Sequence, residues 1–124
     1  MSRPHILVAD KTGYWTRMLG ERLPAEQFDL TLTSNALAVA KAFTDQAPSA
    51  LICEYELDEL AAPQLFQLLQ SNAVFAVTPL IVYTHHPYEH WQEALTDIHH
   101  ATWLHKHEHD IDSLVEVVYK RLNI

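Results

Sequence analysis

The chain has 124 residues, which predicts a single domain over 1-124, and 48% of them are hydrophobic, enough to bury a core. Its net charge of −8 comes without a basic stripe that could neutralise phosphates, so we expect no nucleic acid among its partners. A lone cysteine, Cys53, cannot form an internal disulfide, which favours a reducing, cytoplasmic setting. No apolar run is long enough to span a membrane and the first residues lack the shape of a signal peptide, so we expect no membrane partner.

Short apolar runs alternate with stretches at helical spacing along the whole chain. In chain order, the apolar runs predict five strands, over about residues 5–9, 28–33, 50–54, 80–83 and 101–105. The stretches that follow them predict five helices, over about residues 15–23, 36–43, 61–70, 88–98 and 111–122. Strict alternation of this kind predicts an α/β domain in which helices cover both faces of a parallel sheet.

Residues at the helix ends agree with these boundaries. Pro24 ends the first helix, and Ser34 is predicted to cap the second. Pro63 lies in the first turn of the third helix. Asp110 lies near the start of the last helix, which has two basic residues in its final turn, and these charges suit the helix dipole.

Polar side chains stand where four of the predicted strands end. Asp10 follows the first strand, Glu54 closes the third, Thr84 follows the fourth and Lys106 follows the fifth. The carboxyl ends of parallel strands meet at one edge of a sheet, where ligands bind in open α/β folds. We therefore expect two carboxylates, a hydroxyl and an ammonium to lie together at this edge.

The segments that carry these residues, over 6–11, 48–54, 78–84 and 103–106, occur in the order found in a response-regulator receiver domain. The chain resembles this CheY-like superfamily along essentially its whole length. The resemblance implies a flavodoxin-like (βα)5 fold, a doubly wound parallel five-stranded sheet with strand order 2-1-3-4-5. It also implies that Glu54 stands where the family has the aspartate that accepts a phosphoryl group.

The departures from the family pattern fall on this pocket. Lys11 stands where the family has a second acidic residue, and His85 follows Thr84 where a small residue is usual. If Mg²⁺ binds, Asp10 and Glu54 would be its ligands, but Lys11 removes an oxygen ligand and adds a positive charge beside the cation. The extra methylene of Glu54 moves its carboxylate away from the geometry of in-line transfer. We therefore expect no cofactor, no catalytic residue and no enzyme activity.

Two roles remain open for Glu54. Its carboxylate either pairs with Lys106 or Lys11 and partly mimics a phosphorylated aspartate, or it is an inert polar cap at a strand end. In the first case the domain would be held in one signalling state. Charge alone is a poor mimic, because one carboxylate has fewer acceptor oxygens and less charge than a phosphate.

The resemblance implies a contact surface formed by the fourth helix, the fifth strand and the fifth helix. Here this surface would include Trp91, Trp103 and Tyr119, and a symmetric homodimer through it is one expected assembly. Trp103 stands at the family's aromatic switch position. It either changes orientation with the state of Thr84 or is a bulky residue that partly covers the sheet edge.

The chain contains 9 histidines, most of them in its second half. Histidines can hold a transition metal, but no HExxH or CxxC pattern accompanies them, so we expect no metal site. A response to pH is the better alternative, since histidines gain charge near about pH 6.5.

We therefore predict a degenerate receiver, or pseudo-receiver, of bacterial two-component signal transduction. It would act by phosphorylation-independent protein–protein interaction with a signalling protein. The alternative is a receiver that still accepts a phosphoryl group from a histidine kinase in a phosphorelay. A third hypothesis, a flavodoxin-like domain that binds a small ligand, ranks last because the chain has only 2 glycines and no glycine-rich loop.

Overall fold

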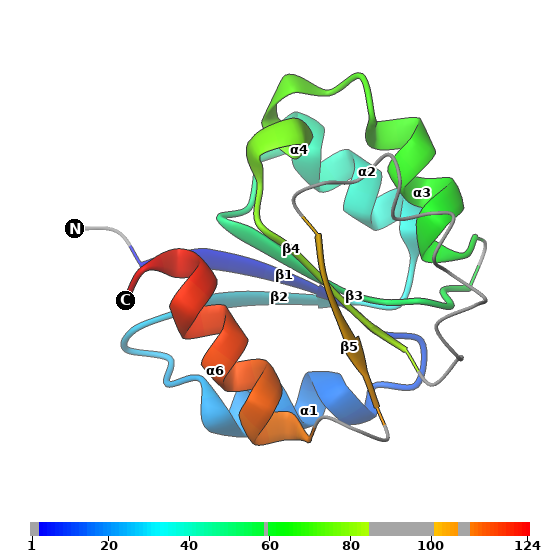
Figure 1. Cartoon of the computed structure of the whole chain (residues 1–124). Coiled ribbons are helices and arrows are strands. Elements are labelled where there is room, and N and C mark those ends of the chain that lie inside the picture. The colour runs from blue at the N-terminus through cyan, green and yellow to red at the C-terminus, as the bar shows by residue number, and fades with distance from the viewer. Residues whose placement is uncertain (1–2, 59, 85–100, 107–109) are drawn as a thin grey trace.

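The computed structural model describes residues 3–58, 60–84, 101–106 and 110–124. Its five parallel strands form one sheet in the order β2-β1-β3-β4-β5 (Figure 1). The strands are, in chain order, β1 His5–Ala9, β2 Asp29–Thr33, β3 Ala50–Glu54, β4 Leu80–Thr84 and β5 Ala101–His105. The predicted flavodoxin-like fold with strand order 2-1-3-4-5 is confirmed.

Helices cover both faces of this sheet. They are α1 Tyr14–Arg22, α2 Ala36–Asp45, α3 Ala62–Leu69, α4 Ala73–Val77 and α6 Ile111–Leu122. Figure 1 shows α1 and α6 on one face and α2, α3 and α4 on the other. The helix predicted over 88–98 lies outside the described residues. Within the described part of the chain, no helix is both long enough and apolar enough to cross a bilayer.

Alternation along the strands divides the core into two clusters, one under each helical layer. On β1, Leu7 belongs to the cluster beneath α2, α3 and α4, whereas Ile6 and Val8 belong to the cluster beneath α1 and α6. β3 and β4 are buried along their whole length, which explains why their sequences are continuous apolar runs. β2 lies at an edge and is partly exposed, as its alternating sequence predicts.

The cap of α2 differs from the prediction. Asn35, not Ser34, caps this helix, because its side-chain oxygen accepts hydrogen bonds from the N–H groups of Leu37 at 2.7 Å and Ala38 at 3.2 Å. Ser34 lies one residue too early to reach these amides. Both residue types favour helix caps, so the sequence alone does not distinguish them.

The sequence pattern does not predict α4, and the expected single helix between β3 and β4 is therefore wrong. Five residues are too few to show a helical apolar period. The side chain of Asn72 starts the helix by accepting hydrogen bonds from the amides of Val74 and Phe75, at 2.9 and 3.0 Å. The ring of Phe75 then packs against those of Phe43 and Phe66, with centroids 5.4 and 5.8 Å apart.

Candidate functional site

Three charged side chains gather where the strands end, on the sheet face that α1 and α6 cover. Asp10 follows β1, Glu54 closes β3 and Lys106 follows β5. Val8, Ile52 and Leu104 lie two residues before Asp10, Glu54 and Lys106, respectively, and all three belong to the cluster beneath α1 and α6. Because side chains alternate between the two faces of a sheet, all three are directed to the same face.

Glu54 uses both of its carboxylate oxygens within the protein. Its Oε1 accepts a hydrogen bond from the ammonium of Lys106 at 2.9 Å, and this contact is an ion pair. Its Oε2 accepts a hydrogen bond from the backbone N–H of Lys11 at 2.9 Å. The pair is largely removed from water, since the side chains of Lys106 and Glu54 keep only 17% and 7% of their exposure. Lys11 itself is exposed and contributes only its backbone.

Asp10 is bound to the start of α1. Its Oδ2 accepts hydrogen bonds from the backbone N–H groups of Trp15 at 2.9 Å and Thr16 at 3.1 Å. Its Oδ1 accepts from the N–H of Thr12 at 3.1 Å and from the hydroxyl of Thr12 at 3.2 Å. Gly13, which precedes α1, has a φ of 79° and no side chain that could cap the helix. Asp10 therefore caps α1 from further upstream, with its charge at the positive end of the helix dipole.

The two carboxyl groups hold their protons differently. Burial raises the pKa of Asp10, but the adjacent Glu54 side chain and the amides of Thr16 and Thr12 outweigh burial, so this pKa lies below its usual range. Burial and the neighbouring Asp10 raise the pKa of Glu54 above its usual range, against the opposing effect of Lys106. Asp10 is therefore the firmer negative charge of the two.

These contacts determine whether Mg²⁺ fits the site. Magnesium requires near-octahedral oxygen ligation, and a carboxylate offers about four lone-pair positions. The hydrogen bonds from Thr12, Trp15 and Thr16 already occupy those of Asp10. The carboxylate of Glu54 is held by Lys106, whose ammonium would repel a cation at the same place. The residues present therefore do not fit Mg²⁺, and no group of three or more His, Cys, Asp or Glu among the described residues could hold another metal ion.

Thr84 is buried beside this site. It ends β4, is 1% exposed and comes two residues after Val82 of the cluster beneath α2, α3 and α4. Its carbonyl oxygen accepts a hydrogen bond from the N–H of Lys106 at 2.7 Å, which joins the ends of β4 and β5. His85 lies outside the described residues, and its place at the pocket mouth stays a prediction.

The three aromatic residues of the predicted contact surface are not brought together within the described part of the chain. Trp103 packs half-buried against the cluster beneath α2, α3 and α4, with its ring 6.2 Å from that of Tyr55. Tyr119 packs on the other side of the sheet, with its ring 5.5 Å from that of Phe28. Trp91 lies outside the described residues. Trp103 and Tyr119 thus belong to different faces of the sheet, and Tyr119 takes part in the packing between α6 and the segment before β2.

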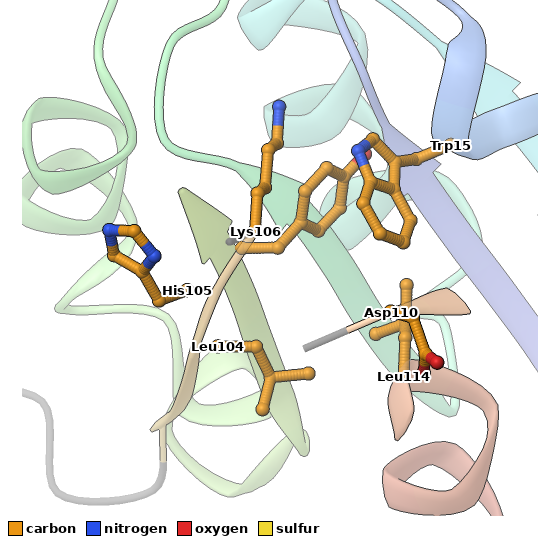
Figure 2. A pocket seen from close by; sticks show the side chains of 7 residues that line it. Trp15, Leu104, His105, Lys106, Asp110 and Leu114 are labelled. Carbon is orange, nitrogen blue, oxygen red and sulfur yellow. The ribbon is translucent and has the colours of Figure 1, made fainter. Parts of the chain in front are cut away.

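Sequence reasoning misses the role of two aromatic side chains beneath the ion pair, Tyr83 and Trp15. Tyr83 on β4 is paired in register with Glu54 on β3 and is 2% exposed. The ammonium of Lys106 lies 5.2 Å from the centroid of the Tyr83 ring, and the ring of Trp15 lies 5.4 Å from it. Together they line a small pocket, with Leu104, Asp110 and Leu114 on its other sides (Figure 2). Alternation along β4 could have identified Tyr83, because it shares the face of Ile81.

The chain matches no protein-family model, and no curated protein matches it in sequence. Its structure is similar to solved receiver domains. The receiver domain of the Francisella response regulator 1452 is 18% identical, with a TM-score of 0.81 and 98% of each chain covered. A CheY-like response regulator receiver domain protein from Methanospirillum hungatei is 15% identical, with a TM-score of 0.82, 98% of this chain and 95% of that chain covered.

A third similar structure is the receiver domain of a sensor histidine kinase from Pseudomonas aeruginosa, which has a magnesium ion coordinated in its active-site cleft. It is 14% identical, with a TM-score of 0.83, and 99% of this chain and 100% of that chain are covered. Identities this low show the fold alone. The chain therefore has the CheY-like fold of response-regulator receiver domains.

Proposed function

We propose that this chain is a pseudo-receiver of a bacterial signalling pathway, which acts by phosphorylation-independent protein–protein interaction. The observation that carries this proposal is the state of the two carboxylates. Glu54 is held by Lys106 and by the amide of Lys11, while the lone pairs of Asp10 serve the start of α1. Neither group is left to bind Mg²⁺ and an incoming phosphoryl group, and transfer to a carboxylate needs both.

The ion pair supports a single, constant signalling state. Here the longer side chain of Glu54 brings its carboxylate to 2.9 Å from the ammonium of Lys106 without a phosphoryl group. The pair is largely buried, so water and salt screen it little. Breaking it would leave a buried charge without its partner, which is unfavourable.

The partner would be another signalling protein or a second copy of this chain. The candidate surface is the edge formed by β5, with Trp103 half-buried beside it. The net charge of −8 speaks against nucleic acid as a partner of this domain, and nothing supports a membrane partner. A cytoplasmic location would suit this function.

Phosphorylation itself tests the proposed function. The chain is incubated with acetyl phosphate and Mg²⁺, and with beryllofluoride in a parallel sample, and its intact mass is measured. We expect no gain of a phosphoryl group and no trapped adduct, while a receiver with an intact acceptor aspartate serves as the positive control. An adduct located on Glu54 or Asp10 would overturn the proposed function.

A matched double variant locates the cause. Lys11→Asp together with Glu54→Asp supplies a second acidic side chain and a shorter acceptor at the same strand ends. We expect this variant to be phosphorylated although the parent is not. The carboxylate introduced by Lys11→Asp is free to bind Mg²⁺, because the amides at the start of α1 bind Asp10 instead. If both proteins stay unmodified while the positive control reacts, the loss has a cause other than these two side chains.

The second candidate function is a receiver that still accepts phosphate from a histidine kinase. The close approach of a carboxylate and a lysine at the ends of β3 and β5 favours it, since an acceptor site needs both groups. A mass gain on Glu54 in the experiment above would support this candidate over the first.

A further inference from the structure

The ammonium of Lys106 donates one hydrogen bond among the described residues, which leaves two of its N–H groups. It donates to Oε1 of Glu54 at 2.9 Å, while the other carboxylate oxygen accepts from the amide of Lys11. An ammonium has three N–H donors, and burying it is costly unless its charge is stabilised on several sides. The next group around it is the ring of Tyr83, whose centroid lies 5.2 Å from the Nζ atom.

The face of an aromatic ring attracts a cation through its quadrupole when the cation lies within about 6 Å of the centroid. Lys106 meets this condition with Tyr83, and its side chain keeps only 17% of its exposure, so the attraction is only weakly screened by water. The ammonium thus interacts with both a carboxylate oxygen and an aromatic ring.

The ring of Tyr83 is itself fixed in place. Tyr83 is 2% exposed and is paired in register with Glu54 on β3 and Leu104 on β5. The ring of Trp15 from α1 packs against it, with centroids 5.4 Å apart and planes inclined by 46°. The sheet therefore sets where the Tyr83 ring lies relative to Glu54, and Lys106 is placed between them.

The hydroxyl of Tyr83 is not what holds Lys106. It is buried, forms no hydrogen bond of normal geometry among the described residues, and interacts with the nearby carboxylate of Asp10. Burial, together with the nearby charges of Asp10 and Glu54, raises the pKa of Tyr83 well above its usual range, so the side chain stays neutral. The contact with Lys106 is therefore made by the ring, and a phenylalanine would make it equally well.

We propose that Tyr83 is a positioning residue whose ring face holds the ammonium of Lys106 against Glu54, so that the pair stays closed without a phosphoryl group. This role rests on the proposed function, since a constantly closed pair is what a phosphorylation-independent state requires. Tyr83 acts on the pocket through Lys106 and touches no substrate.

Lysine reactivity tests this role. The folded chain is labelled slowly with an amine-reactive reagent, and the rate at each lysine is followed by peptide mass spectrometry, with the exposed Lys41 and Lys120 as internal references. In Tyr83→Leu, which keeps an apolar side chain but removes the ring, we expect Lys106 to react about 2-fold to about 30-fold faster, the range that a cation–π contact provides. In Tyr83→Phe, which keeps the ring, the Lys106 rate should equal that of the parent.

A control separates positioning from mere loss of stability. Phe28→Leu removes a buried ring from the same cluster, beside Tyr119 and away from Lys106. If Lys106 becomes reactive through general loosening, this variant will raise its rate as much as Tyr83→Leu does, and the proposed role of Tyr83 is then wrong. An unchanged rate in Tyr83→Leu, or an increase in Tyr83→Phe, refutes it equally.

A second readout is the side-chain ammonium signal of Lys106 in ¹⁵N NMR spectra. Hydrogen exchange with water should be slow in the parent and in Tyr83→Phe but fast in Tyr83→Leu. The outcome is independent of phosphorylation, because all samples lack phosphodonors. If the parent instead gains a phosphoryl group in the mass experiment, the proposed function fails whatever the Lys106 rates are.

Discussion

Replacing Asp10 by alanine should destabilise the protein, because Asp10 caps α1. The substitution removes the acceptor for the amides of Trp15 and Thr16 at a carboxylate that is only 2% exposed. A buried donor left without a partner costs about 1–3 kcal/mol. The part-buried amides of Trp15 and Thr16 lose theirs, while the amide of the exposed Thr12 can bind water instead. Water that enters the vacated space offsets part of this cost. We expect the free energy of unfolding to fall by about 2–4 kcal/mol.

Urea unfolding at neutral pH, followed by far-UV circular dichroism and tryptophan fluorescence, measures this change. Asp10→Asn is the graded variant, because its amide keeps one oxygen for α1 and loses the charge, so its loss should be intermediate. Asp110→Ala is the matched control. Asp110 caps α6 through the amide of Ser113 at 2.9 Å, but it is exposed, so its removal should cost less than that of Asp10.

The sign of the change decides between two roles for Asp10. If its carboxylate were chiefly an acidic metal ligand held near Glu54, removing it would relieve repulsion and stabilise the metal-free protein. An unchanged or raised free energy of unfolding in Asp10→Ala would therefore refute the cap and the argument that Asp10 has no lone pair left for Mg²⁺. The loss should also shrink at acidic pH. A lowered pKa means that the stabilisation from Asp10 is present above the pKa of the unfolded chain and is lost as the pH falls through that of the folded state.

Three further predictions follow from the same contacts. The stability of the parent relative to Glu54→Gln should decrease as the pH rises above the pKa of an unfolded glutamate. The pKa of Glu54 is raised in the folded protein, so the stability it contributes is present below the unfolded pKa and is lost as the pH rises through the folded one. Equal slopes of unfolding free energy against pH in the two proteins would contradict this. Lys106→Met should lower the free energy of unfolding by about 3 kcal/mol in urea, because it leaves the buried Glu54 without its partner. Adding Glu54→Leu should recover most of this loss. A double variant as unstable as Lys106→Met would show that the ion pair is not the cause. Asp112 on α6 forms an exposed ion pair with Arg22 on α1. Asp112→Ala should therefore change the free energy of unfolding by less than about 1 kcal/mol in the same assay. A larger loss would show that water does not screen this contact.

The parallel sheet could be predicted because its signal is local, whereas the strand order 2-1-3-4-5 is what the resemblance to receiver domains implies. Each strand is a short apolar run, and helical stretches separate the runs, which leaves a parallel sheet as the natural arrangement. The positions of Asp10, Glu54 and Lys106 at one edge follow from the same reasoning, since each stands where a strand ends. Short elements were harder: α4 has only five residues and is set by the packing of Phe75 between Phe43 and Phe66.

Which groups the pocket residues bind could not be predicted from the pattern. The sequence leaves open whether Glu54 pairs with Lys106, with Lys11 or with neither. In the structure Glu54 accepts hydrogen bonds from the side chain of Lys106 and from the backbone N–H of Lys11. Any residue except proline could donate this backbone hydrogen bond, so the residue type at position 11 does not predict it. The role of Tyr83 is hidden in the sequence for a related reason. A tyrosine in an apolar strand cannot be distinguished from other core residues until its neighbour on the next strand, here Glu54, is known.

Apolar periodicity and the polar residues at the strand ends are thus sufficient to predict a parallel sheet and the edge at which the pocket lies, while the strand order is implied only by the family resemblance. These features depend on neighbours along the chain, and any parallel α/β sheet would place them in the same way. The contacts that the pocket side chains make depend on how the side chains and amides are oriented, and only the folded chain sets that orientation. The left-handed turn at Gly13 brings the amides of α1 to Asp10, and the register of β3 with β4 places the ring of Tyr83 beside Glu54 and under Lys106. Hydrogen bonds and ring contacts act over a few ångströms and need a given orientation, so they are decided by the tertiary structure and not by the order of residues.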